Sequence, residues 1–305
     1  VLAGLIFIVS GGYRNPYAAD QQLHHRVNSE PIDSLALRVP IINNTKKYEL
    51  VLLVISAAWE MDTREEIRKL WASKEESTMQ KEGKSLVIFL VGQFYYVEKE
   101  AAKYGDLLQV DVRETYRNLV YKIEAGFRWI NAKIKSDFVV KVDSDSVVHI
   151  DRLHGNLLKV NKVESNHWFM CSCAQESPLI RDKYSKWYVA ESDYAPAYYP
   201  DYCSGAGYAM KRETFDKIVE RMGKHRVFEI EDAFFTGVVR EDLGEVMFYK
   251  GAVARGYTIF SDCHGGEPIL SILNTEGQFS HYGGYGTDLA AAWRILKQAY
   301  CNHGW

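Results

Sequence analysis

Apolar residues gather in four short runs along the chain, and amphipathic segments separate the first of these runs. The runs cover residues 48–57, 85–93, 107–112 and 137–143, and their length and β-branched content are typical of buried strands. Residues 59–76 and 114–134 instead repeat apolar positions at helical spacing. Strands that alternate with helices in this way predict an α/β fold with a mainly parallel central sheet flanked by helices.

The first 48 residues differ from the rest of the chain. Residues 1–9 are all apolar or glycine, and nine residues are too few to span a bilayer, which takes about 20. They fit the end of a truncated signal-anchor and a buried strand equally well. Residues 10–48 are polar and lack an apolar period, as in a stem. No repeat or linker divides residues 49–305, which we expect to form a single domain.

Charge and cysteine content narrow the class of protein. The net charge is −3 and no strongly basic block is present, so nucleic acid is not expected as a partner. Five cysteines leave at least one without an intramolecular partner, while one or two disulfides and buried free thiols both remain open. The sequon Asn43-Asn44-Thr45 is compatible with a secreted context.

The fourth apolar run ends in two carboxylates, Asp143 and Asp145. Residues i and i+2 of an extended stretch point the same way, so both can face one site at the carboxyl end of the strand. Two like charges this close repel unless a cation lies between them. Oxygen ligands of this kind suit Mn²⁺ or Mg²⁺ with a phosphate-bearing substrate. The alternative is a solvated turn, because Asp and Ser favour turns.

Three later segments carry further candidate chemistry. Gly205 and Gly207 lie in an aromatic segment, where the backbone can approach a ligand closely or form a tight turn. Glu231 and Asp232 interrupt an apolar run, which fits either a general base or the N-terminus of a helix. His264 precedes a double glycine, as in a loop, where a lone histidine is more often structural than a ligand.

Taken in order, these segments resemble the β-1,3-glycosyltransferase family, which includes β-1,3-galactosyltransferases, β-1,3-N-acetylglucosaminyltransferases and, more distantly, Fringe. The resemblance runs from about residue 50 to about residue 270. Its motifs stand here as "REEIRKLW", "DVRETYRNLVYK" and "KWYVAESDYAPAYYPDYCSGAGYAM". The acidic D-D-D triplet keeps its outer pair as Asp143-Ser144-Asp145. The E-D-V-x-x-G motif stands as "EDAFFTG", one residue longer before the glycine.

The resemblance implies a GT-A type fold and a type II membrane protein of the Golgi with a lumenal catalytic domain. Residues 1–9 would then be the remnant of a signal-anchor missing from this fragment, residues 10–48 the stem and residues 49–305 the catalytic domain. The implied reaction transfers a hexose, with galactose as first choice, from a UDP-sugar to a glycoprotein or glycolipid glycan. It forms a β-1,3 linkage with inversion and depends on a metal.

Two alternatives remain beside this reaction. One is a β-1,3-N-acetylglucosaminyltransferase that uses UDP-N-acetylglucosamine as its donor, including a Fringe-like enzyme. The other is a catalytically inactive lumenal sugar-binding member of the family.

The resemblance also assigns roles to the candidate residues. Asp145 and Asp143 would hold Mn²⁺, or Mg²⁺, against the UDP diphosphate, with Asp143 nearer the nucleotide and His264 as a second ligand. Asp232 would be the catalytic base that takes the proton of the acceptor hydroxyl, with Glu231 as the alternate if the extra residue shifts the motif.

Four residues would shape or contact the donor. Gly205 and Gly207 would form the wall beside the donor sugar. Arg64 and Arg68 either contact UDP or stabilise the first helix of the domain, and the sequence leaves these two roles open.

Overall fold

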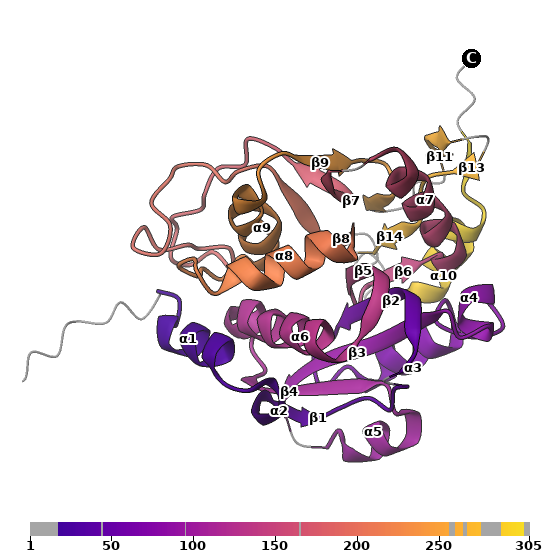
Figure 1. Ribbon diagram of the computed structural model, residues 1–305, viewed down its shortest axis with the longest axis horizontal. Helices are drawn as coiled ribbons and strands as arrows, with labels where there is room; N and C mark the ends of the chain where they lie inside the picture. Colours follow the sequence, from indigo (N-terminus) through magenta and orange to yellow (C-terminus); the bar gives the residue numbers. More distant parts are fainter. Residues whose placement is uncertain are drawn as a thin grey trace, which may run out of the picture.

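An eight-stranded sheet forms the centre of the protein, in the order β1-β4-β3-β2-β5-β8-β7-β9 (Figure 1). The computed structural model describes residues 18–301, except residues 44, 95, 165, 256–259, 265–266 and 276–287. The strands are β1 (Ala36–Arg38), β2 (Lys47–Ile55), β3 (Ser85–Gln93), β4 (Leu107–Arg113), β5 (Lys135–Asp143), β7 (His167–Ala174), β8 (Tyr202–Lys211) and β9 (Val246–Tyr249). Strands β4, β3, β2 and β5 are mutually parallel, while β8 runs antiparallel to β5 and β7. This mainly parallel sheet confirms the predicted GT-A type arrangement.

Helices cover both faces of the sheet (Figure 1). Because β2 lies in the middle of the sheet, its alternate residues enter two hydrophobic cores, Val51, Leu53 and Ile55 in one and Leu50, Leu52 and Val54 in the other. The first core also takes apolar residues of α1 (Gln21–Ser29), α2 (Ile32–Leu35), α6 (Leu119–Lys133) and α8 (Arg212–Met222). The second takes those of α3 (Met61–Lys69), α4 (Thr78–Lys81), α7 (Ile150–Val163) and α10 (Leu289–Lys297).

The four predicted strands correspond to β2, β3, β4 and β5, and the two predicted helices to α3 and α6. Helix α6 begins at Leu119 after a short 3-10 turn, Tyr116–Asn118. The remaining described elements are α5 (Glu98–Tyr104), α9 (Glu231–Ala233), the π-helix η2 (Phe234–Val238), the 3-10 helix η3 (Val239–Leu243), β6 (Ser146–Val148), β10 (Val253–Arg255), β11 (Phe260–Ser261), β12 (Cys263–His264), β13 (Glu267–Pro268), β14 (Ile272–Asn274) and β15 (Tyr300–Cys301).

The prediction of a stem up to residue 48 is wrong for residues 18–48, which belong to the folded domain. Val27 of α1 and Leu35 of α2 are fully buried, and His24 pairs with the buried Glu124 of α6 at 2.8 Å. Strand β1 pairs with β4 at the edge of the sheet. A short helix that buries one narrow side has too few apolar residues to show an apolar period.

The other N-terminal predictions fall on residues 1–17, which lie outside the described residues. In the part of the chain that is described, no helix combines the length and the apolar character needed to cross a membrane. The exposed Asn43 of the sequon accepts hydrogen bonds from the backbone and hydroxyl of Thr45.

Two disulfides are present among the five cysteines, Cys171–Cys203 and Cys263–Cys301, and Cys173 is a free thiol. The first disulfide joins β7 and β8 where their pairing is irregular. Cys171 lies opposite Tyr208, whereas Cys173, two residues later, lies opposite Cys203. The intervening residues of β8 therefore bulge out of the regular ladder, which brings the backbone around Gly205 to the site described next.

Candidate active site

A cavity of about 580 Å³ lies beside the carboxyl end of β5 and gathers residues from distant parts of the chain. Its walls come from the turn between β5 and β6, the bulged part of β8, the segment 229–232, the loop between β7 and β8, and the 3-10 turn before α6. Five residues proposed from the sequence line this cavity: Asp143, Asp145, Gly205, Glu231 and Asp232. The two acidic motifs therefore share one site, as the resemblance implied.

Lys141 joins the two acidic motifs from inside the sheet. Its side chain is 1% exposed, and its Nζ donates to Asp143 Oδ1 at 2.8 Å and to Glu231 Oε1 at 2.6 Å. A third hydrogen bond, at 2.6 Å, goes to the backbone oxygen of Gly205. Burial lowers the pKa of Lys141, but the carboxylates of Asp143 and Glu231 outweigh burial and raise it. Lys141 is therefore a buried, charged residue that holds the two acidic motifs together.

The C-terminal part of the chain holds Asp145 in place. Strand β14 pairs with β6, the strand that directly follows the D-x-D turn. From this strand Asn274 donates to Asp145 Oδ1 at 2.7 Å, and the hydroxyl of Thr275 donates to the Asp145 backbone oxygen at 2.7 Å. Ser144, between the two aspartates, donates to Glu60 at 3.0 Å. The turn is thus fixed on both sides, and the solvated-turn alternative does not describe it.

Glu231 and Asp232 form the first residues of α9, which confirms the helix N-terminus, and both also line the cavity. Asp232 Oδ2 accepts from the backbone N–H of Gly205 and Oδ1 from that of Ala233, both at 2.8 Å. Burial raises the pKa of Glu231 to about 7. Burial also raises the pKa of Asp232, although the same two N–H groups oppose this. A raised pKa suits a general base near neutral pH.

The two candidate glycines have different roles. Gly205 lines the cavity, and its N–H and carbonyl oxygen bind Asp232 and Lys141 respectively. A Cβ at this position would lie 3.2 Å from Asp232 Oδ2, so a side chain would displace that carboxylate. Gly207 is paired with Val142 in the sheet and packs against Ile272 instead. Only Gly205 is therefore positioned to form the wall of the cavity.

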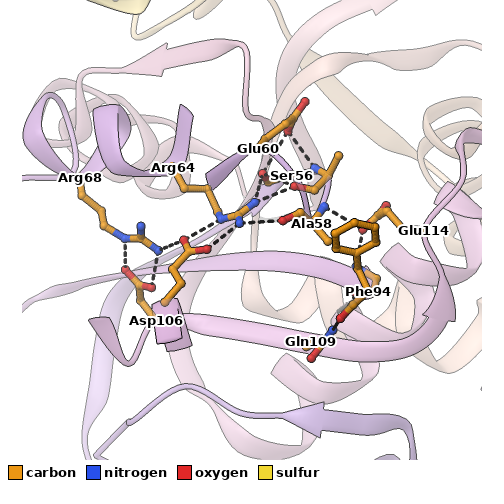
Figure 2. A network of polar contacts seen from close by, with 12 residues as sticks. Ser56, Ala58, Glu60, Arg64, Arg68, Phe94, Asp106, Gln109 and Glu114 are labelled. Carbon is orange, nitrogen blue, oxygen red and sulfur yellow. Dashed lines mark hydrogen bonds and ion pairs between the residues drawn. The ribbon is translucent and has the colours of Figure 1, made fainter. Parts of the chain in front are cut away.

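Arg64 and Arg68 take the second of the two roles that the sequence left open, and neither lines the cavity. Figure 2 shows both guanidinium groups inside a polar network. Arg64 is fully buried, pairs with Glu100 at 2.6 Å and donates to the backbone oxygen of Ala58 at 3.0 Å. Arg68 pairs with Glu100 and with Asp106. These contacts assign both arginines to the support of α3 and of the loop after β2, rather than to the binding of UDP.

The residues present fit a hard divalent cation by their chemistry. Asp143, Asp145, Glu231 and Asp232 bring four carboxylates to one cavity, while Lys141 is the cation that contacts two of them. The described residues contain no group of three or more His, Cys, Asp or Glu side chains arranged to hold a metal. The side chain of His264 lies outside the described residues, so its predicted role stays a prediction.

Sequence reasoning missed three residues of this site. Lys141 was visible as a single lysine in an apolar strand, a signal for a buried charge that needs partners. Asn274 carries no local signal, because its contact with Asp145 spans 129 positions. Glu229, which lines the cavity two residues before Glu231, lies outside the E-D motif and carries no sequence signal of its own.

Comparison with known proteins identifies the family of this chain. The model of the galactosyltransferase family matches residues 62–247. Beta-1,3-galactosyltransferase 1 of Homo sapiens is 31% identical over 235 residues, which cover 73% of this chain and 71% of that protein. Beta-1,3-galactosyltransferase 5 of Pan troglodytes is 31% identical over 192 residues, which cover 61% and 63%.

A solved structure, 4-diphosphocytidyl-2C-methyl-D-erythritol synthase from Anaerococcus prevotii, aligns at 14% identity with a TM-score of 0.37, covering 67% of this chain and 87% of that one. Because this TM-score is low, the fold is assigned from the sheet and helices described above and not from this alignment. The family match spans more than half of the chain, including the D-x-D turn and the E-D segment. The chain belongs to the galactosyltransferase family and is a glycosyltransferase.

Proposed function

We propose that this glycosyltransferase transfers galactose from UDP-galactose to a hydroxyl of a glycan acceptor, forming a β-1,3 linkage with inversion in a metal-dependent reaction. The observation that carries the proposal is the junction at Lys141. This residue ties the D-x-D turn to the E-D segment across 90 positions of sequence, at one cavity. An inverting transfer needs these two parts together, one for the leaving diphosphate and one for the incoming hydroxyl.

Asp143 and Asp145 are the residues that would hold the metal, Mn²⁺ or Mg²⁺. When bound, the metal supplies positive charge against the negative charge that grows on the departing diphosphate. Asp145 is the better candidate for direct ligation, because its carboxylate is oriented by Asn274 from outside the acidic cluster. Asp143 shares its carboxylate with Lys141 and is about one third exposed.

Asp232 is the proposed catalytic base. Two backbone N–H groups fix its carboxylate at the wall of the cavity, so it can accept a proton without rearranging. Glu231 is less suited to this role, because its Oε1 is already bonded to Lys141 and Tyr208 donates to its Oε2 at 3.3 Å. The Golgi lumen and a membrane anchor, which the resemblance implied, remain predictions.

The test of the proposed function is UDP release and sugar transfer by the purified chain. UDP-galactose, UDP-N-acetylglucosamine and UDP-glucose are compared with Mn²⁺ and then with EDTA, against a panel of simple β-linked acceptors. We expect release from UDP-galactose that EDTA abolishes. Release from UDP-N-acetylglucosamine alone would favour the second donor. A folded protein that binds no UDP and releases none would contradict the proposal and favour a sugar-binding role.

A matched pair of variants tests the metal residues. Asp145→Ala should remove the Mn²⁺-dependent part of UDP binding, measured by calorimetry, because a ligand carboxylate is lost. Asp33→Ala, at a largely exposed aspartate of α2 outside the cavity, should leave UDP binding unchanged. Equal UDP affinity of the two variants with Mn²⁺ would place the metal site elsewhere.

A further inference from the structure

A buried carboxyl group without full hydrogen bonding lies in the wall of the same cavity. Glu229 lines the cavity and is 6% exposed. Its Oε1 receives a 3.5 Å hydrogen bond from Arg117, and its Oε2 has no hydrogen-bond partner in the described part of the chain. Burial raises the pKa of Glu229 to about 7. Such a group is costly to the fold, and most buried polar groups are satisfied, so a donor from outside the chain is indicated.

The position of Glu229 relates it to the incoming sugar rather than to the nucleotide. It precedes the proposed base Asp232 by three residues, and both line one cavity. The proposed metal residues, Asp143 and Asp145, come from another wall, the turn between β5 and β6. A hydroxyl that gives its proton to Asp232 belongs to the acceptor, so the other hydroxyls of the same sugar are the donors that this shared wall would bring to Glu229.

Aromatic side chains in the same walls suit a pyranose ring. Tyr116 and Trp187 both line the cavity, and each is about half exposed. The Nζ of Lys186 contacts both rings, 5.9 Å from the ring centre of Tyr116 and 4.5 Å from that of Trp187. Rings that are held in this way and still open to solvent offer flat apolar surface to the C–H face of a sugar.

The charges of the cavity select against an acidic acceptor. Its lining includes five carboxylate residues and one basic residue, Lys186; the acids are Asp143, Asp145, Glu229, Glu231 and Asp232. A uronic acid or a sulfated sugar would be repelled at short range, because the cavity is partly closed from solvent. An uncharged pyranoside meets no such penalty and can donate hydroxyl groups to the acids.

We propose that Glu229 is a specificity-determining residue of the acceptor subsite, which accepts a hydrogen bond from a hydroxyl of an uncharged pyranoside adjacent to the hydroxyl that is glycosylated. Tyr116 and Trp187 carry the apolar face of the same sugar. This assignment rests on the proposed function, since it takes Asp232 as the base. Arg117 then acts as a positioning residue that keeps the Glu229 carboxylate at the wall.

The experiment compares Glu229→Leu and Glu229→Gln with a control, Glu213→Gln, at an exposed glutamate outside this cavity. Acceptor KM, kcat and the acceptor-free hydrolysis of UDP-galactose are measured with p-nitrophenyl β-glycosides of galactose, N-acetylglucosamine, glucose and xylose. We expect Glu229→Leu to lower kcat/KM for the preferred acceptor by about 10- to 100-fold, the range for one hydrogen bond to a charged group. Hydrolysis without acceptor should stay within about twofold, because water needs no such contact.

A series of monodeoxy acceptors then identifies the hydroxyl. The analogue that lacks the contacted hydroxyl should lose the same factor with the wild-type protein and lose little more with Glu229→Leu. Parallel losses of hydrolysis and transfer in Glu229→Leu would overturn the proposal, as would unchanged kinetics with every acceptor. A wild-type protein that neither hydrolyses nor transfers any sugar nucleotide would refute the proposed function itself, a result distinct from both.

Discussion

The protein contains two buried networks of charged side chains that differ in their charge balance. In the network behind α3 (Figure 2), Arg64 and Arg68 face Glu100 and Asp106, so cations and anions are equal in number. In the network at the cavity, Lys141 faces three carboxylates; these belong to Asp143, Glu231 and Asp232. The charges of the first network are balanced, although Nη1 of Arg68 has no hydrogen-bond partner in the described part of the chain, whereas the second network has an excess of negative charge.

This difference in charge balance distinguishes a network that supports the fold from one that belongs to the proposed active site. Both carboxylates of the balanced network, Glu100 and Asp106, have a guanidinium partner, and neither lines the cavity. The acidic network lies in the cavity wall, where burial raises the pKa values of Glu231 and Asp232. Keeping these groups ionised therefore lowers the stability of the fold. Excess charge of this kind persists in a fold when a cation or a substrate compensates it, so charge balance distinguishes the proposed site from the scaffold.

The largest expected effect is on chemistry at the acidic network. Asp232→Asn should lower transfer by about 10²- to 10⁴-fold, because an amide cannot take the acceptor proton. The affinity for UDP-galactose, measured by calorimetry with Mn²⁺, should stay within about threefold. Normal turnover of this variant would show that the base is another residue, and Glu231→Gln would be the next variant to measure.

The second prediction compares the two cations directly. Lys141→Met and Arg64→Met should each destabilise the fold, by about 3–5 kcal/mol in urea unfolding, because each leaves a buried carboxylate without its partner. Only Lys141→Met should also lower kcat of the folded enzyme, by about 10- to 100-fold, since it releases the side chains that line the site. The kcat of Arg64→Met, corrected for the folded fraction, should stay within about threefold.

The double variant Lys141→Met/Glu231→Gln provides the control for this comparison. Neutralising Glu231 removes the unpaired charge and should recover much of the lost stability, whereas kcat should remain low because Asp143 is still untethered. Recovery of both stability and kcat would mean that Lys141 does no more than neutralise Glu231.

The smallest expected effect concerns the pH dependence of stability. The pKa of Glu229 is about 7 in the folded protein, above the ordinary 4.5, so the folded state binds a proton more tightly than the unfolded chain does. The stabilisation this proton provides is complete below pH 4.5 and is lost as the pH rises through 7. Glu229→Gln should therefore equal the wild type near pH 4.5 and exceed it by about 2–3 kcal/mol at pH 8.

Urea unfolding at several pH values measures this difference, with Glu100→Gln as the contrasting variant from the balanced network. Its two arginines outweigh burial and lower the pKa of Glu100, so this variant should instead be less stable than the wild type above pH 4.5. A gain for Glu229→Gln that is the same at pH 4.5 and pH 8 would contradict the ionisation argument.

The sequence predicts the parts of the fold that have a strong local period. Strands β2, β3 and β5 are continuous apolar runs because both faces of the sheet are covered, and a run of this kind is visible without a structure. Helix α1 is not predicted from the sequence, because it buries only His24 and Val27, too few residues to form an apolar stripe. Its attachment to α6 depends on the tertiary contact between His24 and Glu124.

The same distinction holds at the site. Asp143, Asp145 and Asp232 are found because acidic residues next to apolar runs are conspicuous and match ordered motifs. The roles of Arg64 and Lys141 could not be found, because a buried cation is defined by partners far along the chain. Lys141 meets Glu231 across 90 positions, and Arg64 meets Glu100 across 36.

The hydrogen bonds from the segment of β14 to the D-x-D turn limit how far the protein can be truncated at its C-terminal end. The family match ends at residue 247, yet Asn274 and Thr275 are the residues that fix Asp145. An expression fragment cut at the family boundary would keep every acidic residue of the cavity and still lose the orientation of the D-x-D turn. Fragments for crystallisation or engineering should therefore retain the segment through β14, and α1 at the other end, although both lie outside the matched region.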